Sequence, residues 1–133
     1  YSIRSFIIKD EARTMEILYK WMKDPDPHVR RLCSEGTRPR LPWSMKIDSF
    51  VKDPSPSLSI LEAWKNDPDL YVRRSVANHV GDIAKDNMEL ALELCENWSL
   101  NASKELKWLI RHALRNPAKK GNLKALEIRK NAR

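Results

Sequence analysis

The sequence has few of the features that sheets and membrane segments require. It contains only three glycines in 133 residues and no runs in which apolar and polar residues alternate, which argues against a β-sheet fold. No apolar run approaches the length of a bilayer span, and no secretory signal peptide is present. We therefore expect an all-α protein of a reducing cytosol.

The sequence also has few candidate metal ligands. Its two cysteines, Cys33 and Cys95, both fall on apolar stripes of expected helices, so we interpret them as small core residues rather than as a disulfide or a metal site. His112 has no second histidine or cysteine at ligand spacing. We expect no metal and no cofactor.

Acidic residues are outnumbered by basic ones. There are 25 Lys and Arg residues against 18 Asp and Glu residues, a formal net charge of +7. For a small protein, this excess favours a polyanionic partner such as a nucleic acid. The length of 133 residues suits a single domain with a hydrophobic core.

The polar chemistry is concentrated in residues 24–43, DPDPHVRRLCSEGTRPRLPW. Asp26 followed by Pro27 predicts the N-cap and first residue of a helix. Gly36 is expected in the left-handed position just after that helix. The apolar stripe of the helix is expected at Val29, Leu32 and Cys33.

Beyond the helix, Pro39 and Pro42 enforce extended geometry. We expect a rigid arm that carries Arg38, Arg40 and Trp43. A lone tryptophan such as Trp43 is more often a core residue than a binding residue. Arg31 and Glu35 lie one turn apart, which suits either a surface ion pair or a functional pair.

The helix recurs further along the chain. Residues 67–80, DPDLYVRRSVANHV, repeat DPDPHVRRLCSEG at an offset of 43, and LEAWKNDPD repeats LYKWMKDPD. A period of this length, made of two helices and a turn, is typical of HEAT-like repeats, whose units stack and bury a continuous core. The predicted fold is therefore an α-helical superhelix of about three helix pairs.

A third unit follows with a shorter spacing. Its second helix, KELKWLIRHALR, aligns Ile110 with Val72 at an offset of 38. The expected repeats span about 10–43, 57–86 and 87–116, with partial units at 1–9 and 117–133. Because no initiator Met is present and no cap precedes Ile3, we expect a single domain that is part of a longer polypeptide.

The repeat brings two carboxylates together. The second DPD helix has a polar line at Arg74, Asn78, Asp82 and Lys85, and Asn78 occupies the position of Glu35. If the stack keeps its register, Glu35 and Asp82 project from adjacent parallel helices onto one surface. The alternative is a solvated face of i,i+4 ion pairs.

In the third unit, four residues at helical spacing form a cationic strip with one aromatic ring: Trp108, Arg111, His112 and Arg115. Arginines suit phosphates, and aromatic rings suit bases or sugars. His112 by itself is equally compatible with an ordinary surface position.

These segments carry a resemblance that covers nearly the whole chain. HVRRLCSEGTRPRLPW, SPSLSILEAWKNDPDLYVRRSVANHVGDIAKDN and ASKELKWLIRHALR resemble the HEAT-like-repeat alkylpurine DNA glycosylases of the AlkC/AlkD superfamily, and the AlkC branch most. The resemblance implies a basic concave face that holds duplex DNA and releases N3- or N7-alkylated bases. It also implies a bacterial cytosolic protein that acts as a monomer. From the resemblance, we expect that these 133 residues do not include the further N-terminal helices of this family or the C-terminal domain of some AlkC-type proteins.

The resemblance assigns functional positions to Arg31, Glu35, Trp43 and Asp82, with Trp108 and Arg111 as further counterparts. Asp82 is the first catalytic candidate and Glu35 the second, each as a stabiliser of a cationic sugar or as a group that orients water. The expected DNA-binding residues are Arg31, Arg38, Arg40, Trp43, Arg74, Asn78, Trp108, Arg111 and Arg115.

Two other classes of function remain open. A non-catalytic nucleic-acid-binding module would keep the arginines but would have no use for Glu35 and Asp82, whose charge weakens phosphate binding. A protein-interaction scaffold would show exposed apolar residues along the concave face, which the pattern does not predict. The two carboxylates favour the enzyme.

Overall fold

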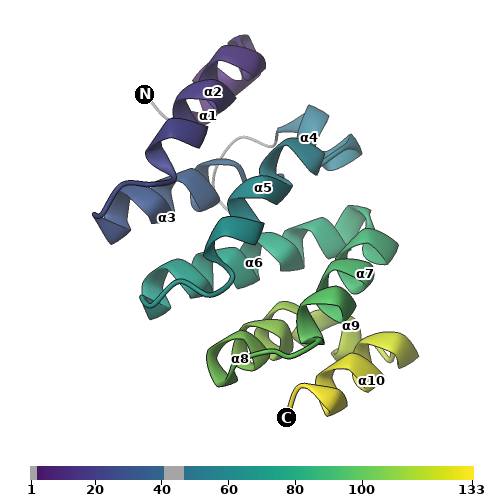
Figure 1. Ribbon diagram of the computed structural model, residues 1–133. Helices are drawn as coiled ribbons and strands as arrows, with labels where there is room; N and C mark the ends of the chain where they lie inside the picture. The colour runs from purple at the N-terminus through teal and green to yellow at the C-terminus, as the bar shows by residue number, and fades with distance from the viewer. Residues whose placement is uncertain (1–2, 41–46) are drawn as a thin grey trace.

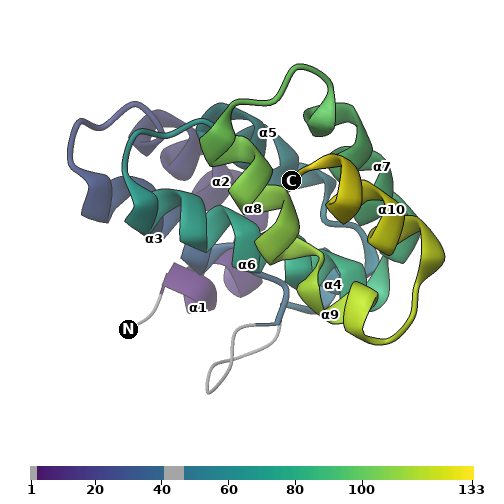
Figure 2. The same cartoon turned by 90° about the horizontal axis from the view of Figure 1, so that it is seen from below.

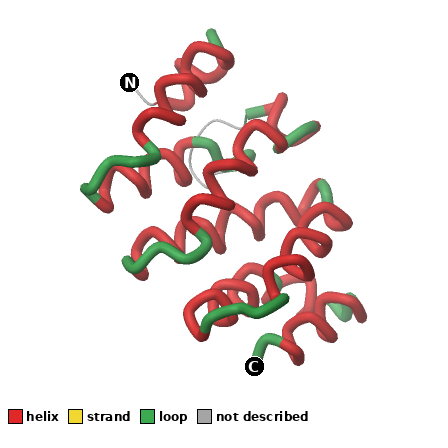
Figure 3. The backbone as a smooth tube through the Cα atoms, viewed as in Figure 1, coloured by secondary structure: helices red, strands yellow, loops and turns green. Residues whose placement is uncertain are grey.

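The computed structural model describes residues 3–40 and 47–133, which form ten helices and no strand within those ranges (Figure 3). Trp43 lies outside the described residues. The helices, in chain order, are α1 Ile3–Lys9, α2 Glu11–Trp21, α3 Pro27–Gly36, α4 Asp48–Lys52, α5 Ser55–Trp64, α6 Leu70–Asp86, α7 Met88–Ser99, α8 Lys104–Ala113, α9 Arg115–Lys119 and α10 Leu123–Asn131.

The helices stack as pairs along one direction, from α1 and α2 at one end to α10 at the other (Figure 1). Helices α3, α6 and α8 pack side by side, with α6 in the middle. The first helices of the pairs, α2, α5 and α7, form the other layer (Figure 2). The prediction of an all-α helical-repeat fold is confirmed.

The helix start predicted at Asp26 is confirmed, and three other helices begin in the same way, with a side chain that accepts a backbone N–H. Asp26 accepts from the N–H of His28 at 2.9 Å, and Asp69 accepts from that of Tyr71 at the same distance. Asp10 caps α2 and Ser103 caps α8 in the same manner. Such caps satisfy backbone donors that have no partner within the helix.

In the turns before α3 and α6, equivalent arginine side chains make the same pair of hydrogen bonds, which confirms the offset of 43. Arg30 Nη1 donates to the carbonyl oxygens of Asp24 and Pro25, and Arg73 Nη1 donates to those of Asp67 and Pro68. Arg30 also reaches the next turn, where its Nε lies 2.8 Å from Asp67 Oδ2. The same hydrogen-bond geometry therefore closes both turns, and the ion pair between Arg30 and Asp67 joins them.

The predicted offset of 38 for the third unit is wrong. Asp69 is the N-cap of α6 and Ser103 is the N-cap of α8, which places equivalent residues 34 apart. Val72 then aligns with Leu106, and both are buried. A shift of four residues is about one helical turn, so the apolar pattern fits either register and only the caps distinguish them.

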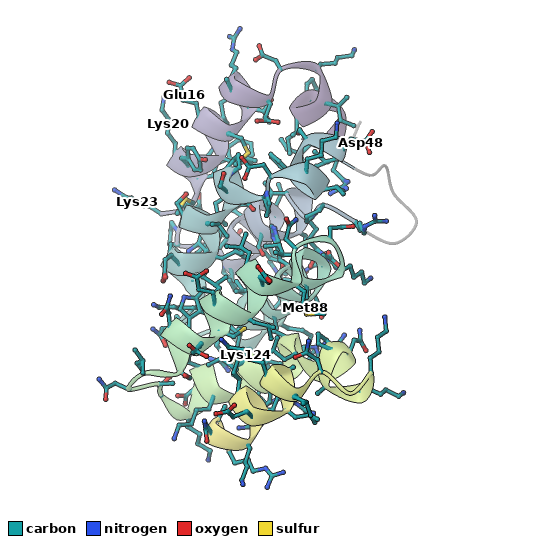
Figure 4. All side chains as sticks on the ribbon, turned by 90° about the vertical axis from the view of Figure 1, so that its right-hand side faces the viewer. Glu16, Lys20, Lys23, Asp48, Met88 and Lys124 are labelled. Carbon is teal, nitrogen blue, oxygen red and sulfur yellow. The ribbon has the colours of Figure 1, made fainter. Side chains whose placement is uncertain are left out.

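The core runs along one face of α6 in the middle repeat, where Val72, Val76, Val80 and Ile83 are all fully buried. Cys33 and Cys95 are buried free thiols, as expected. The prediction that Leu32 lies on the apolar stripe of its helix is wrong, because Leu32 is 42% exposed and lies outside the core. Charged side chains project outward from the first-helix layer, as Glu16 and Lys20 do in Figure 4.

The prediction for Gly36 is also wrong. Gly36 is the last residue of α3, and Thr37 is the C-cap. Among the described residues, only Asn101 and Gly121 have a positive φ. Gly36 is needed for a different reason, because a Cβ at this position would lie 2.5 Å from Cγ2 of Ile3 in α1.

Nowhere in the described part of the chain is a helix long and apolar enough to cross a bilayer.

Candidate functional site

Arg38 joins the two carboxylates that the sequence singled out. Its Nε and Nη2 atoms donate to Asp82 Oδ2 and Oδ1 at 2.5 and 3.1 Å. Its Nη1 donates to Glu35 Oε2 and Oε1 at 3.2 and 3.4 Å. Glu35 comes from the last turn of α3 and Asp82 from the middle of α6, so one guanidinium bridges two neighbouring helices.

The cluster is withdrawn from solvent. The Asp82 side chain is 4% exposed and the Glu35 side chain 14%, so Glu35 is the more accessible carboxylate. Burial raises the pKa of the Asp82 carboxyl, and the hydrogen bonds and charge of Arg38 oppose that rise. Burial would lower the pKa of Arg38, but Asp82 and Glu35 together raise it above its ordinary value. We therefore treat Arg38 and Asp82 as an ion pair at neutral pH.

Further polar groups border the cluster. Ser75 Oγ donates to Glu35 Oε1 at 2.9 Å, and Arg31 Nη2 lies 3.8 Å from Glu35 Oε2. Lys85 Nζ lies 3.9 Å from Asp82 Oδ1. The side chains of Arg31 and Lys85 are 39% and 54% exposed, so the two carboxylates are bordered by cations that can face a polyanion.

Sequence reasoning missed His79, which lies beneath the cluster. It is fully buried in α6, with Nδ1 2.9 Å from the carbonyl oxygen of Ser34 and Nε2 3.2 Å from Ser57 Oγ. Because a carbonyl oxygen only accepts, Nδ1 carries the proton. The sequence did contain an indication of this site, because Ser75, His79 and Asp82 recur at helical spacing among the buried valines of α6.

We expect the protein to lose stability in acid through His79. Burial lowers the pKa of His79 from 6.5 to about 3, so protonation is disfavoured in the folded state. The stabilisation is complete above pH 6.5 and is lost as the pH falls toward 3, with a total on the order of a few kcal/mol. The measurement is the free energy of urea unfolding at several pH values between 7 and 4.

The comparison uses His79→Gln, in which the acid-induced loss should be smaller. His28→Gln is the matched control, because His28 is exposed and the same substitution there should leave the wild-type pH profile in place. Parallel profiles for all three proteins would contradict a role for His79.

The exposed side of α3, α6 and α8 carries the other predicted contacts. Arg31 lies over the ring of Tyr71, with its guanidinium carbon 4.6 Å from the ring centroid. His112 Nε2 lies 3.2 Å from Asn78 Oδ1, and its ring stacks on Trp108 with centroids 5.0 Å apart. Tyr71 is a second aromatic on this face that the sequence patterns did not indicate.

The remaining arginines are less uniform than the sequence suggested. Arg74 is exposed on α6. Arg40 forms a two-bond pair with Asp86 at 2.7 and 2.8 Å. Arg111 donates to the carbonyl oxygen of Ala132 and so ties α8 to the end of α10, while Arg115 donates to that of His112. Arg38 and Arg111 therefore have structural partners, whereas Arg31 and Arg74 face solvent.

The geometry suits charge stabilisation. Within ranges 3–40 and 47–133, no group of three or more potential ligands is arranged to hold a metal ion. What the residues provide is a pair of fixed carboxylates under a cationic and aromatic surface. Such a site can stabilise a cation on a bound polyanion without rearranging, because its charges are already held in place.

Comparisons with known proteins agree with the helical-repeat fold. The chain is similar to the alkylpurine DNA glycosylase AlkC of Pseudomonas fluorescens, whose structure is bound to DNA containing an abasic site analog, with a TM-score of 0.91 and 48% identity over 95% of the chain. The resemblance to the AlkC branch is confirmed. The chain is also 41% identical over 128 residues to protein YhaZ of Bacillus subtilis. No protein-family model matches the chain.

The matched region is only part of these proteins. The chain spans 35% of the AlkC chain and 36% of YhaZ, although 95% or more of its own residues take part in each match. The carboxylate cluster and the α3, α6 and α8 face thus lie within the part that is shared with AlkC.

Proposed function

We propose that this chain provides the catalytic region of a DNA repair glycosylase that hydrolyses the N-glycosidic bond of N3- or N7-alkylated bases in duplex DNA. The observation that carries the proposal is the pair of carboxylates, partly buried Glu35 and buried Asp82, held by Arg38 beneath a cationic face. The similarity to AlkC over 95% of the chain supports it.

The chemistry explains why carboxylates suit this site. An alkylated purine of this kind is cationic, so its bond to the sugar is already weak and no strong general acid is needed. The remaining barrier lies in the developing positive charge on the deoxyribose and in the placement of water. We assign the sugar-facing role to a carboxylate of this pair, with Asp82 and Glu35 both as candidates.

The burial of the pair suggests a division of labour between them. Glu35 is the more exposed carboxylate and lies next to the solvent-facing Arg31, so it is better placed to orient water or meet the sugar. Asp82 holds two nitrogen atoms of Arg38 and adds a second negative charge close by. Removal of either charge leaves an arginine cation less well compensated next to a developing cation.

The same face provides a site for the DNA backbone. We propose that Arg31, Arg74, Asn78 and Trp108 contact phosphates and sugars there, together with Arg40, Trp43, Arg111 and Arg115. This open face suits a grip on a distorted backbone. We propose that a protein with such a partner acts in the bacterial cytosol or nucleoid, that it acts as a monomer and that the chain is one repeat domain of a longer protein.

The direct test is release of free 3-methyladenine and 7-methylguanine from methylated duplex DNA. The protein should release at least one of these bases at a rate above the spontaneous rate, and undamaged duplex should yield no free base. Release at the spontaneous rate only, despite DNA binding, would contradict the proposed activity.

A non-catalytic DNA-binding module is the second candidate. One observation favours it, because Arg38 compensates both carboxylates and leaves them resembling a structural ion-pair network. This alternative predicts DNA binding without base release, so the same assay distinguishes the two candidates.

We expect DNA binding to be electrostatic and largely independent of sequence. The logarithm of the association constant should fall linearly with the logarithm of salt concentration, by about 0.9 for each phosphate neutralised. Arg74→Gln should reduce the magnitude of that slope by about 0.9, the value for one phosphate contact, because Arg74 is exposed on the proposed DNA face. Lys20→Gln, on the other helix layer, is the control that should leave the slope unchanged. Salt-insensitive binding, or a strong preference for one undamaged sequence, would argue against this surface.

A further inference from the structure

Arg4 of α1 is buried and reaches the turn that carries Arg38. Only 2% of Arg4 is exposed. Its Nη1 donates to the carbonyl oxygen of Gly36 at 3.2 Å and to that of Arg38 at 2.6 Å. The last carbonyls of a helix have no partner within it and attract cations, so Arg4 acts as a side-chain cap at the end of α3.

A second contact from α1 fixes the same turn. Ile3 packs so closely on Gly36 that a Cβ there would lie 2.5 Å from Ile3 Cγ2. Residues 3 and 4 therefore contact the end of α3 through a steric contact and through hydrogen bonds. The N-terminal helix, although distant in sequence, determines where the backbone of Arg38 lies.

The position of that backbone matters because the Arg38 side chain has little freedom. It bridges Glu35 in the last turn of α3, three residues earlier, and Asp82, 44 residues away, with donor–acceptor distances between 2.5 and 3.4 Å. A backbone shift of about 1 Å would lengthen these contacts beyond hydrogen-bond range, and misplacement of this size at an active site can cost about a hundredfold in rate.

The charge of Arg4 also belongs to the cluster. Burial and the nearby charge of Arg38 lower the pKa of Arg4, while Asp82 and Glu35 raise it. Two arginines and two carboxylates therefore lie within each other's electrostatic field. Arg4 offsets the negative charge of Asp82 and Glu35 from a position that is buried within the described structure.

We propose that Arg4 is a positioning residue of the excision site, which acts through the Arg38 backbone and never contacts DNA. The proposal rests on the proposed glycosylase function. It extends the site to α1, which none of the sequence motifs connected to Glu35 and Asp82.

The test compares Arg4→Met with Arg4→Lys. Single-turnover base release with saturating protein should be at least about tenfold slower in Arg4→Met, while the dissociation constant for the same duplex stays at the wild-type value. Arg4→Lys should recover much of the rate, because an ammonium can still donate to both carbonyl oxygens. A well-folded Arg4→Met protein with the wild-type excision rate would overturn the proposal, even if its melting temperature were lower.

A second pair of variants tests the same turn if Arg4→Met does not fold. Gly36→Ala should slow excision, because the new methyl group pushes Ile3 and α1 away from the turn. Ile3→Ala removes the clashing atom, so the double variant should be faster than Gly36→Ala alone. Additive losses in the double variant would count against α1 as a positioning element. Absence of base release by the wild-type protein would overturn the glycosylase function itself, a result distinct from unchanged release in the variants.

Discussion

Replacement of Asp82 by asparagine is expected to lower excision of alkylated bases by roughly 10²-fold or more. The substitution keeps the shape of the side chain but removes a negative charge that lies 2.5 Å from Arg38 Nε. Arg38 would then be a poorly compensated cation beside the sugar on which positive charge develops. DNA affinity should hold or rise slightly, because a charge that repels phosphate is gone. The measurement is single-turnover base release with saturating protein, beside a binding titration.

The chain contains a matched control for this variant. Asp67 has the same exposure as Asp82, with a side chain that is 4% exposed, and it accepts two hydrogen bonds from Arg30 at 2.8 and 3.2 Å. Asp67→Asn therefore carries a similar structural cost at a turn away from the cluster, and its excision rate should stay near that of the wild type. Equal losses in both variants would mean that Asp82 acts only through stability.

Glu35→Gln completes the series. It should also slow excision, and a milder effect than that of Asp82→Asn is expected if the main task of Glu35 is to orient Arg31 one turn earlier. Unchanged excision in both Glu35→Gln and Asp82→Asn would make the carboxylates ordinary charges. The non-catalytic binding module would then be the better description.

Local rules were enough to predict where the helices begin. Asp26, and Asp69 through the repeat, cap helices as their positions in the sequence indicated, because a cap depends on the next two or three residues only. The offset of 43 was predictable for the same reason, since each DPD turn closes on an arginine six residues later. The all-α stack follows from these units.

Contacts between distant helices could not be predicted in this way. Gly36 was interpreted as a helix terminator, yet its role is to admit Ile3 from α1, 33 positions earlier. Leu32 fits an apolar stripe, but this residue is 42% exposed. The polar line that contains Asp82 did not indicate that this residue is buried, and its pairing with Arg38 joins residues 44 positions apart. Each error concerns which neighbour a residue meets, which helical periodicity does not specify.

The largest effect on stability is expected from Val76→Asp in the middle repeat. Val76 is fully buried in α6, the helix that packs between α3 and α8. An unpaired buried carboxylate costs several kcal/mol, which is on the order of the total stability of a small domain. Since about three repeats are the minimum for a stable stack, loss of the middle unit leaves its neighbours without a partner. The whole chain should unfold, and no single repeat should remain.

Leu123→Asp provides the control, because Leu123 is 82% exposed and the same chemical change there buries no charge. Circular dichroism at increasing temperature should show one cooperative transition near the wild-type temperature for Leu123→Asp and no folded baseline for Val76→Asp. A cooperative Val76→Asp transition near the wild-type temperature would show that position 76 is not buried. A transition of reduced amplitude would show that the outer repeats fold independently, since the helices on either side of α6 would then keep their structure without it.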